Sequence, residues 1–455
     1  MNRGVAGWSM GTAINAMKER KISAAEYLTD LMNHEKEVGN FGAYITSTFE
    51  QAQSQVISGS NSILHGIPLV VKDNIDVAGV PTTAGTPGMI CLIPEHHSEV
   101  WGRLSACGAV LAGKASMHEL AYGITGINSA FPTAQNPAIK GYLAGGSSSG
   151  TAAAVSAGLV PAGLGTDTGG SVRLPAAHCG IVGFRPTTGR YSSKGVVRIS
   201  SSRDTVGLMA RNVKDIIILD EIINSRPYKE VEGIFSSAIP TLGLPEGAWQ
   251  SIEPDVADVL YRAIEKLKAA GWIITRTGQE IHGGNTERLL HVATLIPLAE
   301  TSHMVNEYLQ KHGSDVTFSY ILKKIASPDV KDILQSTEKA PVSPQDYQDV
   351  LQQQASLRSE AWQAFKNLTL SAVVVPTSVI TAPPLDISAR DGTKTFLKYI
   401  RNTAPAAVLG YPSITIPAGI TPSGCPVGIQ FDGLPGHDRA VLNLALRCSL
   451  ILGNV

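Results

Sequence analysis

The sequence predicts a single large α/β/α domain, residues 1–455, in which helices flank a central, mixed and twisted β-sheet. Three observations predict this fold class. Short aliphatic runs have the length of buried strands, helical apolar patterns lie between them, and residues 239–275 have the pattern of a strand, a helix and a second strand. This alternation is typical of α/β folds, because the connecting helices cover both faces of a sheet.

The first predicted element is a helix that follows Ser23. Ser23 and Glu26 have the spacing of a capping box, and apolar residues recur at helical intervals until Gly39 ends the pattern. Further helices are expected at residues 98–107 and 256–267, and strands at residues 67–71, 109–112, 239–244, 272–275, 372–376 and 413–417. The strand runs are short and mostly aliphatic, as in strands covered on both faces.

Two regions differ from the rest in composition. Residues 140–190 are rich in Gly, Ser, Thr and Ala, which favours tight turns and close approach of backbones. Residues 280–370 have mainly helical patterns, with one start at Ser343 and Pro344, and carry much of the charge. We expect a core at about 60–215 that carries the candidate catalytic residues, and a mainly helical insertion at about 280–370.

Charge and composition exclude several classes of protein. Lys+Arg 37 and Asp+Glu 38 leave a formal net charge of -1, which attracts neither nucleic acid nor an anionic membrane. The first residues lack a signal-peptide apolar block, and no run approaches the roughly 18 apolar residues of a membrane span. Five widely spaced cysteines without a CxxC pair favour a reducing compartment. We therefore expect a cytoplasmic protein with no nucleic-acid or membrane partner.

The turn Gly169-Gly170-Ser171 is the first candidate for chemistry. Glycines adopt backbone conformations that other residues avoid, so several N–H groups can converge on one point beside the serine. We expect the N–H groups of Thr168, Gly169, Gly170 and Ser171 to form an oxyanion hole. The alternative is a flexible glycine turn between two core elements.

Lys72 is the candidate base for such a serine. A serine attacks a carbonyl only with a base beside it, and a lysine serves once burial has lowered its pKa. Lys72 follows the apolar run Leu69-Val70-Val71, and strand alternation places Asp73 on the opposite face. The alternative is a strand-end lysine that reaches solvent.

The segment Gly146-Ser-Ser148-Ser-Gly150 also fits the nucleophile elbow of an α/β-hydrolase. In that hypothesis the protein is an esterase that uses Ser148, with a later Asp and His437 as the candidate partners. The elbow requires a buried strand directly before the motif, and residues 136–144 have a poor strand pattern. We therefore disfavour Ser148 as the nucleophile.

Neither a nucleotide nor a metal ion is expected as a cofactor. Residues 108–114 imitate a phosphate-binding loop, but Ala115 stands where Mg²⁺ binding requires Ser or Thr. His96, His97 and His118 have no third ligand at a fitting spacing, which favours surface or hydrogen-bonded structural roles.

Several segments together resemble the amidase signature family, whose members use a Ser-Ser-Lys triad. The matching segments are GIPLVVKDN at 66–74, GAVLAGK at 108–114, GGSSSGTAAA at 145–154, GTDTGGSVRLPAA at 165–177 and CGIVGFRPT at 179–187. The resemblance covers nearly the whole chain and is weak only at about 220–370. It implies the amidase signature fold.

The resemblance also implies roles for three residues. Ser171 is the nucleophile that forms the acyl-enzyme, Ser147 is the bridging serine, and neutral Lys72 is the ultimate base. In this family a cis peptide bond precedes the bridging serine, so the bond between Gly146 and Ser147 is expected to be cis. The triad requires neither a metal ion nor an organic cofactor.

The sequence also predicts which residues line the acyl pocket and which ones brace the turn of Ser171. By analogy with the family, Ala121, Tyr122 and Ile124 should line the acyl pocket, and the last two favour an apolar acyl group. Asp167 and Arg173 are expected to brace the nucleophile loop, because a charged pair in so glycine-rich a region serves as a scaffold.

Residues 117–123 and 184–191 look like the branch of the family that hydrolyses indoleacetamide and mandelamide. The expected activity is hydrolysis of a small primary amide with an aryl or apolar acyl group to a carboxylate and ammonia. The alternative within the family is the amidase subunit of a tRNA-dependent amidotransferase, which would supply ammonia to a partner. The expected ligand is the amide substrate, and a homodimer is the candidate assembly.

Overall fold

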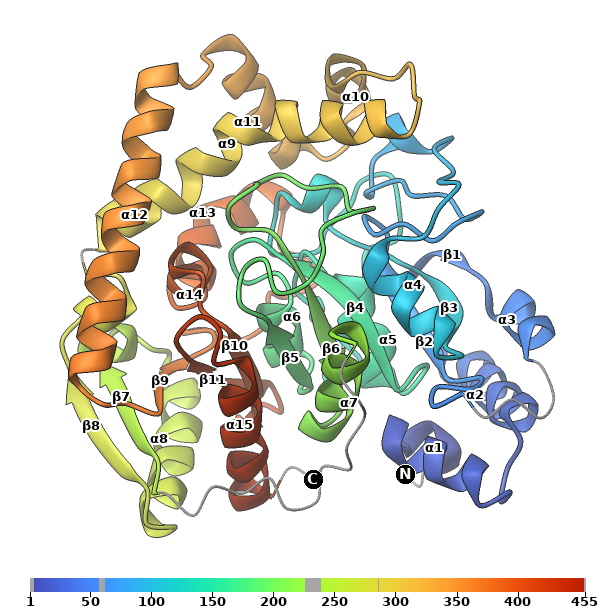
Figure 1. Cartoon of the computed structure of the whole chain (residues 1–455), viewed down its shortest axis with the longest axis horizontal. Helices are drawn as coiled ribbons and strands as arrows, with labels where there is room; N and C mark the ends of the chain where they lie inside the picture. Colours follow the sequence, from blue (N-terminus) through green and yellow to red (C-terminus); the bar gives the residue numbers. More distant parts are fainter. Residues whose placement is uncertain (1–3, 57–61, 226–238, 285, 454–455) are drawn as a thin grey trace.

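The computed structural model describes residues 4–56, 62–225, 239–284 and 286–453. Eleven strands in these ranges form one sheet (Figure 1). The strands are β1 (Tyr44–Ser47), β2 (Pro68–Lys72), β3 (Val110–Ala115), β4 (Ala162–Asp167), β5 (Val182–Arg185), β6 (Thr205–Ala210), β7 (Thr241–Pro245), β8 (Ile273–Thr277), β9 (Ala372–Pro376), β10 (Ser413–Ile420) and β11 (Pro426–Asp432).

The sheet is mixed, and its strand order is β1-β3-β2-β4-β6-β5-β10-β11-β9-β7-β8. β2 pairs in parallel with both β3 and β4, whereas β6 is antiparallel to β4 and to β5. Because β2 and β4 are parallel, their carboxyl ends meet at the same edge of the sheet. That edge carries the candidate catalytic residues.

Helices cover both faces of the sheet. They are α1 (Met10–Lys18), α2 (Ala24–Val38), α3 (Phe49–Gln55), α4 (Glu99–Ala106), α5 (Ser149–Ala157), α6 (Arg173–His178), α7 (Val213–Ile223), α8 (Pro254–Ala269), α9 (Thr286–Lys311), α10 (Phe318–Lys324), α11 (Pro328–Lys339), α12 (Pro344–Asn367), α13 (Ala389–Ile400), α14 (Ala404–Leu409) and α15 (Asp438–Leu452). The helices α9 to α11 lie along the top of the view in Figure 1, and α12 runs down its left side, in yellow and orange. In the described ranges, none of these helices combines the length and apolar character that a membrane crossing needs.

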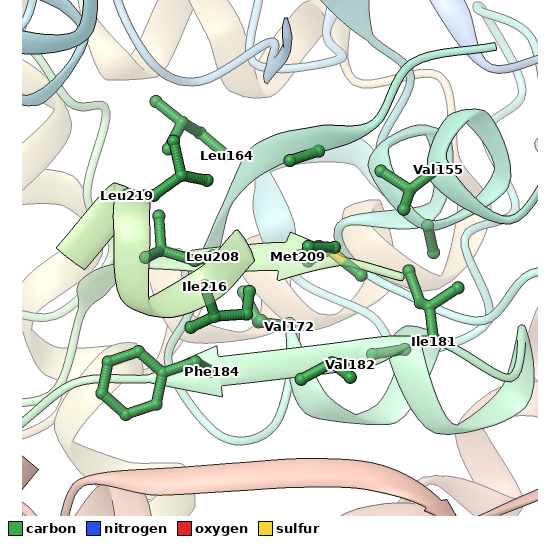
Figure 2. Close-up of a cluster of buried hydrophobic side chains, with 14 of the residues drawn as sticks. Val155, Leu164, Val172, Ile181, Val182, Phe184, Leu208, Met209, Ile216 and Leu219 are labelled. Atoms are coloured by element: carbon green, nitrogen blue, oxygen red, sulfur yellow. The ribbon is translucent and has the colours of Figure 1, made fainter. Parts of the chain in front are cut away.

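The two faces of β4 differ in side-chain size. A Cβ atom at Gly163 would lie 2.9 Å from Cγ2 of Thr151, and one at Gly165 would lie 2.7 Å from Oγ of Ser148, so α5 packs directly on the backbone of the strand. On the opposite face, Leu164 points toward α7 in the buried cluster of Figure 2. The face of β4 that carries Gly163 and Gly165 thus brings the amino-terminal end of α5 close to the carboxyl end of β4.

Most of the expected elements are confirmed. The capping box of Ser23 and Glu26 begins α2, and the runs expected as strands at 67–71, 239–244, 272–275 and 372–376 correspond to β2, β7, β8 and β9. The strands expected at 109–112 and 413–417 extend to Ala115 and Ile420.

The sequence patterns did not reveal β1, β4, β5, β6 and β11. The last four contain glycine, which has a low strand propensity because it has no side chain to pack. In this fold the absence of a glycine side chain permits close packing on these strands. A Cβ atom at Gly183, Gly207 or Gly428 would lie within 3.0 Å of atoms of Val172, Ala176 or Ala177, so these strands let the α6 segment approach.

Candidate active site

Lys72 is the last residue of β2 and is fully buried. Its Nζ lies 2.7 Å from Oγ of Ser147 and 2.8 Å from Oγ1 of Thr166. Thr166 belongs to β4. Val71 of β2 pairs with Leu164 of β4, so the parallel pairing of the two strands brings Lys72 and Thr166 together. Asn74 donates to Oγ1 of Thr166 at 3.1 Å and fixes that hydroxyl.

Burial lowers the pKa of Lys72 to about 7, against the opposing attraction of Asp167 and Asp204. The lysine therefore spends a large part of its time uncharged near neutral pH. Asp73 is not among the carboxylates that oppose the lowering of the Lys72 pKa. It points to the other face, and its Oδ1 lies 3.3 Å from Nζ of Lys114. The expectation that alternation separates Asp73 from Lys72 is confirmed.

Ser147 lies in the turn before α5 and is fully buried. The peptide bond between Gly146 and Ser147 is cis, as the family resemblance implied. The carbonyl of Ser147 accepts the N–H of His118 at 3.2 Å. Ser147 is thus fixed on its backbone and contacts Lys72 through its hydroxyl.

Ser148 has a different environment. Its hydroxyl donates to the carbonyl of Thr166 at 3.2 Å and accepts the N–H of the same residue at 3.3 Å. It is fully buried, and residues 144–147 directly before it form no strand. Because an elbow needs that strand and an accessible hydroxyl, the geometry assigns Ser148 to the scaffold.

Ser171 lies in the loop between β4 and α6 and borders a cavity of about 300 Å³. Its carbonyl accepts the N–H of Ser148 at 3.1 Å, which brings the loop of residues 168–172 beside the turn that carries Ser147. Gly170 precedes it at φ 135°, and a Cβ atom there would lie 2.2 Å from Oγ1 of Thr403. Only glycine fits that position.

The carboxylate of Asp167 braces this loop as expected. It accepts the N–H groups of Gly170 and Val172 at 2.9 and 3.1 Å, and it pairs with Arg173 at 2.9 Å and Arg185 at 3.2 Å. Both arginines and the carboxylate are fully buried. Burial raises the pKa of Asp167, but the two guanidinium groups outweigh it and hold the pKa well below its usual value.

The expected set of four N–H donors needs one correction. The N–H of Gly170 already donates to Oδ1 of Asp167. Within the described ranges, the N–H groups of Thr168, Gly169 and Ser171 have no partner in the protein. The sequence could not show that Gly170 differs from the other three residues, because this depends on which N–H group the Asp167 carboxylate accepts.

Ala121, Tyr122 and Ile124 all line the cavity beside Ser171. The hydroxyl of Tyr122 donates to the carbonyl of Pro297 at 3.1 Å, which leaves the ring as the apolar part of this side chain. Gly123 and Thr125 of the same segment line the cavity as well. The structure adds Ile199, Arg203, Ala293, Thr294, Pro297, Leu298, Asp329, Ile333, Phe396 and Ile400, among others.

His118, expected as a surface or hydrogen-bonded structural group, is buried and also borders the same cavity. Its Nε2 lies 3.1 Å from Oδ2 of Asp329, and a Cβ atom at Gly123 would clash with its ring at 2.1 Å. Burial raises the pKa of Asp329, but contact with His118 outweighs it and the net pKa is lowered. The pair forms a polar end in a largely apolar cavity, and Asp329 comes from α11, more than 200 residues away in the chain.

The comparisons with known proteins decide the family. The sequence pattern of the family described as Amidase matches residues 26–442. The chain belongs to the amidase family. It is accordingly an amide-hydrolysing enzyme.

Named relatives agree with that membership. The indoleacetamide hydrolase of Allorhizobium ampelinum is 34% identical over 451 residues, which are 95% of this chain and 96% of the relative. The mandelamide hydrolase of Pseudomonas putida is 34% identical over 466 residues, covering 96% and 90% of the two chains. A crystal structure of an amidase is 28% identical with a TM-score of 0.84, covering 96% of this chain and 98% of that one.

Asp167→Asn is predicted to lower the free energy of unfolding by about 3–5 kcal/mol, because it leaves two buried guanidinium groups without their carboxylate. Urea unfolding at pH 7 measures the change. The control is Asp349→Asn on exposed α12, with an expected change within about 0.5 kcal/mol.

The pH dependence of the difference between wild type and Asp167→Asn is a second readout. Because folding lowers the pKa of Asp167, its contribution is fully present above the unfolded value of 3.8 and is lost as the pH falls through the folded value. An equal stability of wild type and variant at pH 7 would contradict the bracing role.

Proposed function

We propose that this enzyme hydrolyses a small primary amide with an aryl or apolar acyl group through an acyl-enzyme on Ser171. The observation that carries the proposal is the contact of 2.7 Å between Nζ of buried Lys72 and Oγ of Ser147. A lysine whose pKa is lowered to about 7 by burial is a competent base at neutral pH.

In the first step, neutral Lys72 accepts the hydroxyl proton of Ser147, and Ser147 accepts that of Ser171. The Ser171 oxygen then forms a bond to the amide carbon, and the carbonyl oxygen gains the negative charge. The proton returns from Lys72 through Ser147 to the amide nitrogen. The C–N bond breaks, ammonia leaves, and the acyl group remains on Ser171.

Backbone N–H groups stabilise the charge on the oxygen. Those of Thr168, Gly169 and Ser171 have no competing partner in the described chain, so they are the donors we assign. Preorganised donors of this kind act most strongly where water is excluded, and Ser171 is only 7% exposed. In the second step the same relay takes a proton from water, which attacks the acyl carbon and releases the carboxylate.

The acyl group is inferred from the cavity and from the relatives. Ile124, Ile333, Phe396 and Ile400 give the cavity an apolar wall, and a volume of about 300 Å³ accommodates a single aromatic group. The names of the relatives, indoleacetamide hydrolase and mandelamide hydrolase, describe substrates of that size class. We therefore place phenylacetamide, indoleacetamide and mandelamide first among the candidate substrates.

Ser171→Ala is predicted to lower ammonia release by at least about 10³-fold and to abolish covalent labelling by phenylmethanesulfonyl fluoride, because no other hydroxyl in the loop takes its place. Ser148→Ala should retain most of the labelling, since its hydroxyl bonds the Thr166 backbone. Intact-protein mass spectrometry measures the labelling. Loss in Ser148→Ala with retention in Ser171→Ala would transfer the chemistry to the other serine.

The value of kcat/KM is predicted to rise tenfold per pH unit below about pH 7 and to level off above it. The reason is that Lys72 acts only after it has lost its proton, and the unprotonated fraction grows as the pH rises through its pKa. Initial rates from pH 5 to 9 with a neutral amide measure this profile. A pH-independent rate would contradict the role, as would an active Lys72→Arg variant, because arginine stays protonated.

Leu298→Trp is predicted to lower kcat/KM for phenylacetamide by about 10-fold or more and that for acetamide by less than about 3-fold, because the larger side chain fills the acyl cavity. Leu450→Trp, at an exposed position on α15, is the matched control. Ammonia release from phenylacetamide and acetamide measures the preference for the aryl group. Ammonia release from glutamine tests the alternative of an amidotransferase subunit. If none of the arylacetamides is hydrolysed by the wild type, the proposed substrate class is wrong.

A further inference from the structure

Each carbonyl group of the nucleophile loop is held by its own donor. The carbonyl of Asp167 accepts a guanidinium N–H of Arg185, and the carbonyl of Thr168 accepts one of Arg203 at 2.7 Å. The carbonyl of Gly169 accepts the hydroxyl of Thr403 at 2.6 Å. That of Gly170 accepts the N–H of Leu174 at 2.8 Å, within the first turn of α6.

These four contacts determine where the N–H groups point. In a trans peptide the C=O and the N–H of one unit point in opposite directions. A donor that holds the carbonyl of Thr168 therefore turns the N–H of Gly169 to the other side. By the same argument Arg185 orients the N–H of Thr168, Thr403 that of Gly170, and the start of α6 that of Ser171.

Arg203 differs from the other donors because it also reaches the acyl cavity. It lies in the turn before β6, is buried, and lines the cavity beside Ser171. One guanidinium nitrogen binds the carbonyl of Thr168, and the other binds that of Ala293 on α9. Its Nε has no hydrogen-bond partner in the described part of the chain, so the two carbonyls are its main directional contacts.

We propose that Arg203 is a positioning residue for the oxyanion hole, which couples the α9 wall of the acyl cavity to the orientation of the Gly169 N–H. This inference rests on the proposed function of Ser171. Arg203 does not touch the reacting atoms. Its fork ties two carbonyls from separate elements, that of Ala293 on α9 and that of Thr168 beside Ser171.

A lysine at this position could not replace the fork, because its single ammonium cannot reproduce two donors in a fixed plane. The Gly169 N–H would then lose its fixed direction while the cavity wall and the relay remained in place. Since the N–H group acts on the charged oxygen of the transition state and not on the neutral amide, the rate should fall while substrate affinity stays the same.

The test compares Arg203→Lys with Arg211→Lys. Arg211 also binds backbone carbonyls, those of Val160 at 2.8 Å and Val155 at 3.2 Å, but does not border the cavity. Arg203→Lys is expected to lower kcat and the labelling rate with phenylmethanesulfonyl fluoride by about 10- to 100-fold each, a fraction of the effect of losing a full donor. The KM for the neutral amide phenylacetamide should change by less than about 3-fold.

The labelling rate separates this inference from the function on which it rests, because it requires no knowledge of the natural substrate. A wild type that is neither labelled at Ser171 nor active on any amide would contradict the proposed function. A labelled wild type with an equally fast Arg203→Lys would overturn the inference alone. A purely structural role for Arg203 would lower the final extent of labelling at an unchanged rate, and this outcome also overturns it.

Thr403 provides a second pair of variants if Arg203→Lys does not fold. Thr403→Val removes the donor to the Gly169 carbonyl at almost constant volume, and Thr403→Ser keeps it. Arg203 and Thr403 hold the peptide units on the two sides of Gly169, so release of either one loosens the residue that carries the assigned N–H. The valine variant is therefore expected to be labelled more slowly, and the serine variant at the wild-type rate. Equal rates in the two variants would contradict the inference.

Discussion

The structure depends on the burial of one amine. Lys72 ends a strand whose neighbours are apolar, and within the part of the chain that the structure describes no carboxylate forms an ion pair with its Nζ, so its charged form is disfavoured. The parallel pairing of β2 and β4 then places Thr166 and the Ser147 turn around it. An uncharged lysine exists near neutral pH only where the fold excludes water, so Gly163 and Gly165, which let α5 pack on β4, support the lowered pKa of Lys72 as well as the packing.

A second principle governs the loop that carries Ser171. The charges of Asp167, Arg173 and Arg185 are buried together, and each carbonyl group of residues 167–170 accepts a hydrogen bond from its own donor. Such a network is stable only when each member has a partner, because an unpaired charge in the interior costs several kcal/mol. The loop is therefore a rigid element despite its glycines, and its N–H groups have fixed directions.

Much of the candidate site could be predicted from the sequence, since Lys72, Ser147 and Ser171 lie in segments whose residue types and order are specific. The pocket was predictable only at residues 121–124. Its other walls come from α9, α11 and α13, and a helical pattern does not tell which distant strand edge a helix covers. The same reason hid the contact of His118 with Asp329. The strands β4, β5, β6 and β11 were missed because their glycines lower strand propensity while permitting close packing of helices.

The protonation state of Lys72 is the most direct test of this account. Protein labelled with ¹³C at the ε-carbon of lysine, titrated from pH 5 to 11 by NMR, reports each amine, and the Lys72→Arg variant assigns the resonance. We predict one lysine resonance that titrates near pH 7, well below the value of about 10.4 for a lysine in a model peptide, and that is missing from the variant. A Lys72 resonance that titrates at about 10 would show a charged lysine at neutral pH and would contradict the relay.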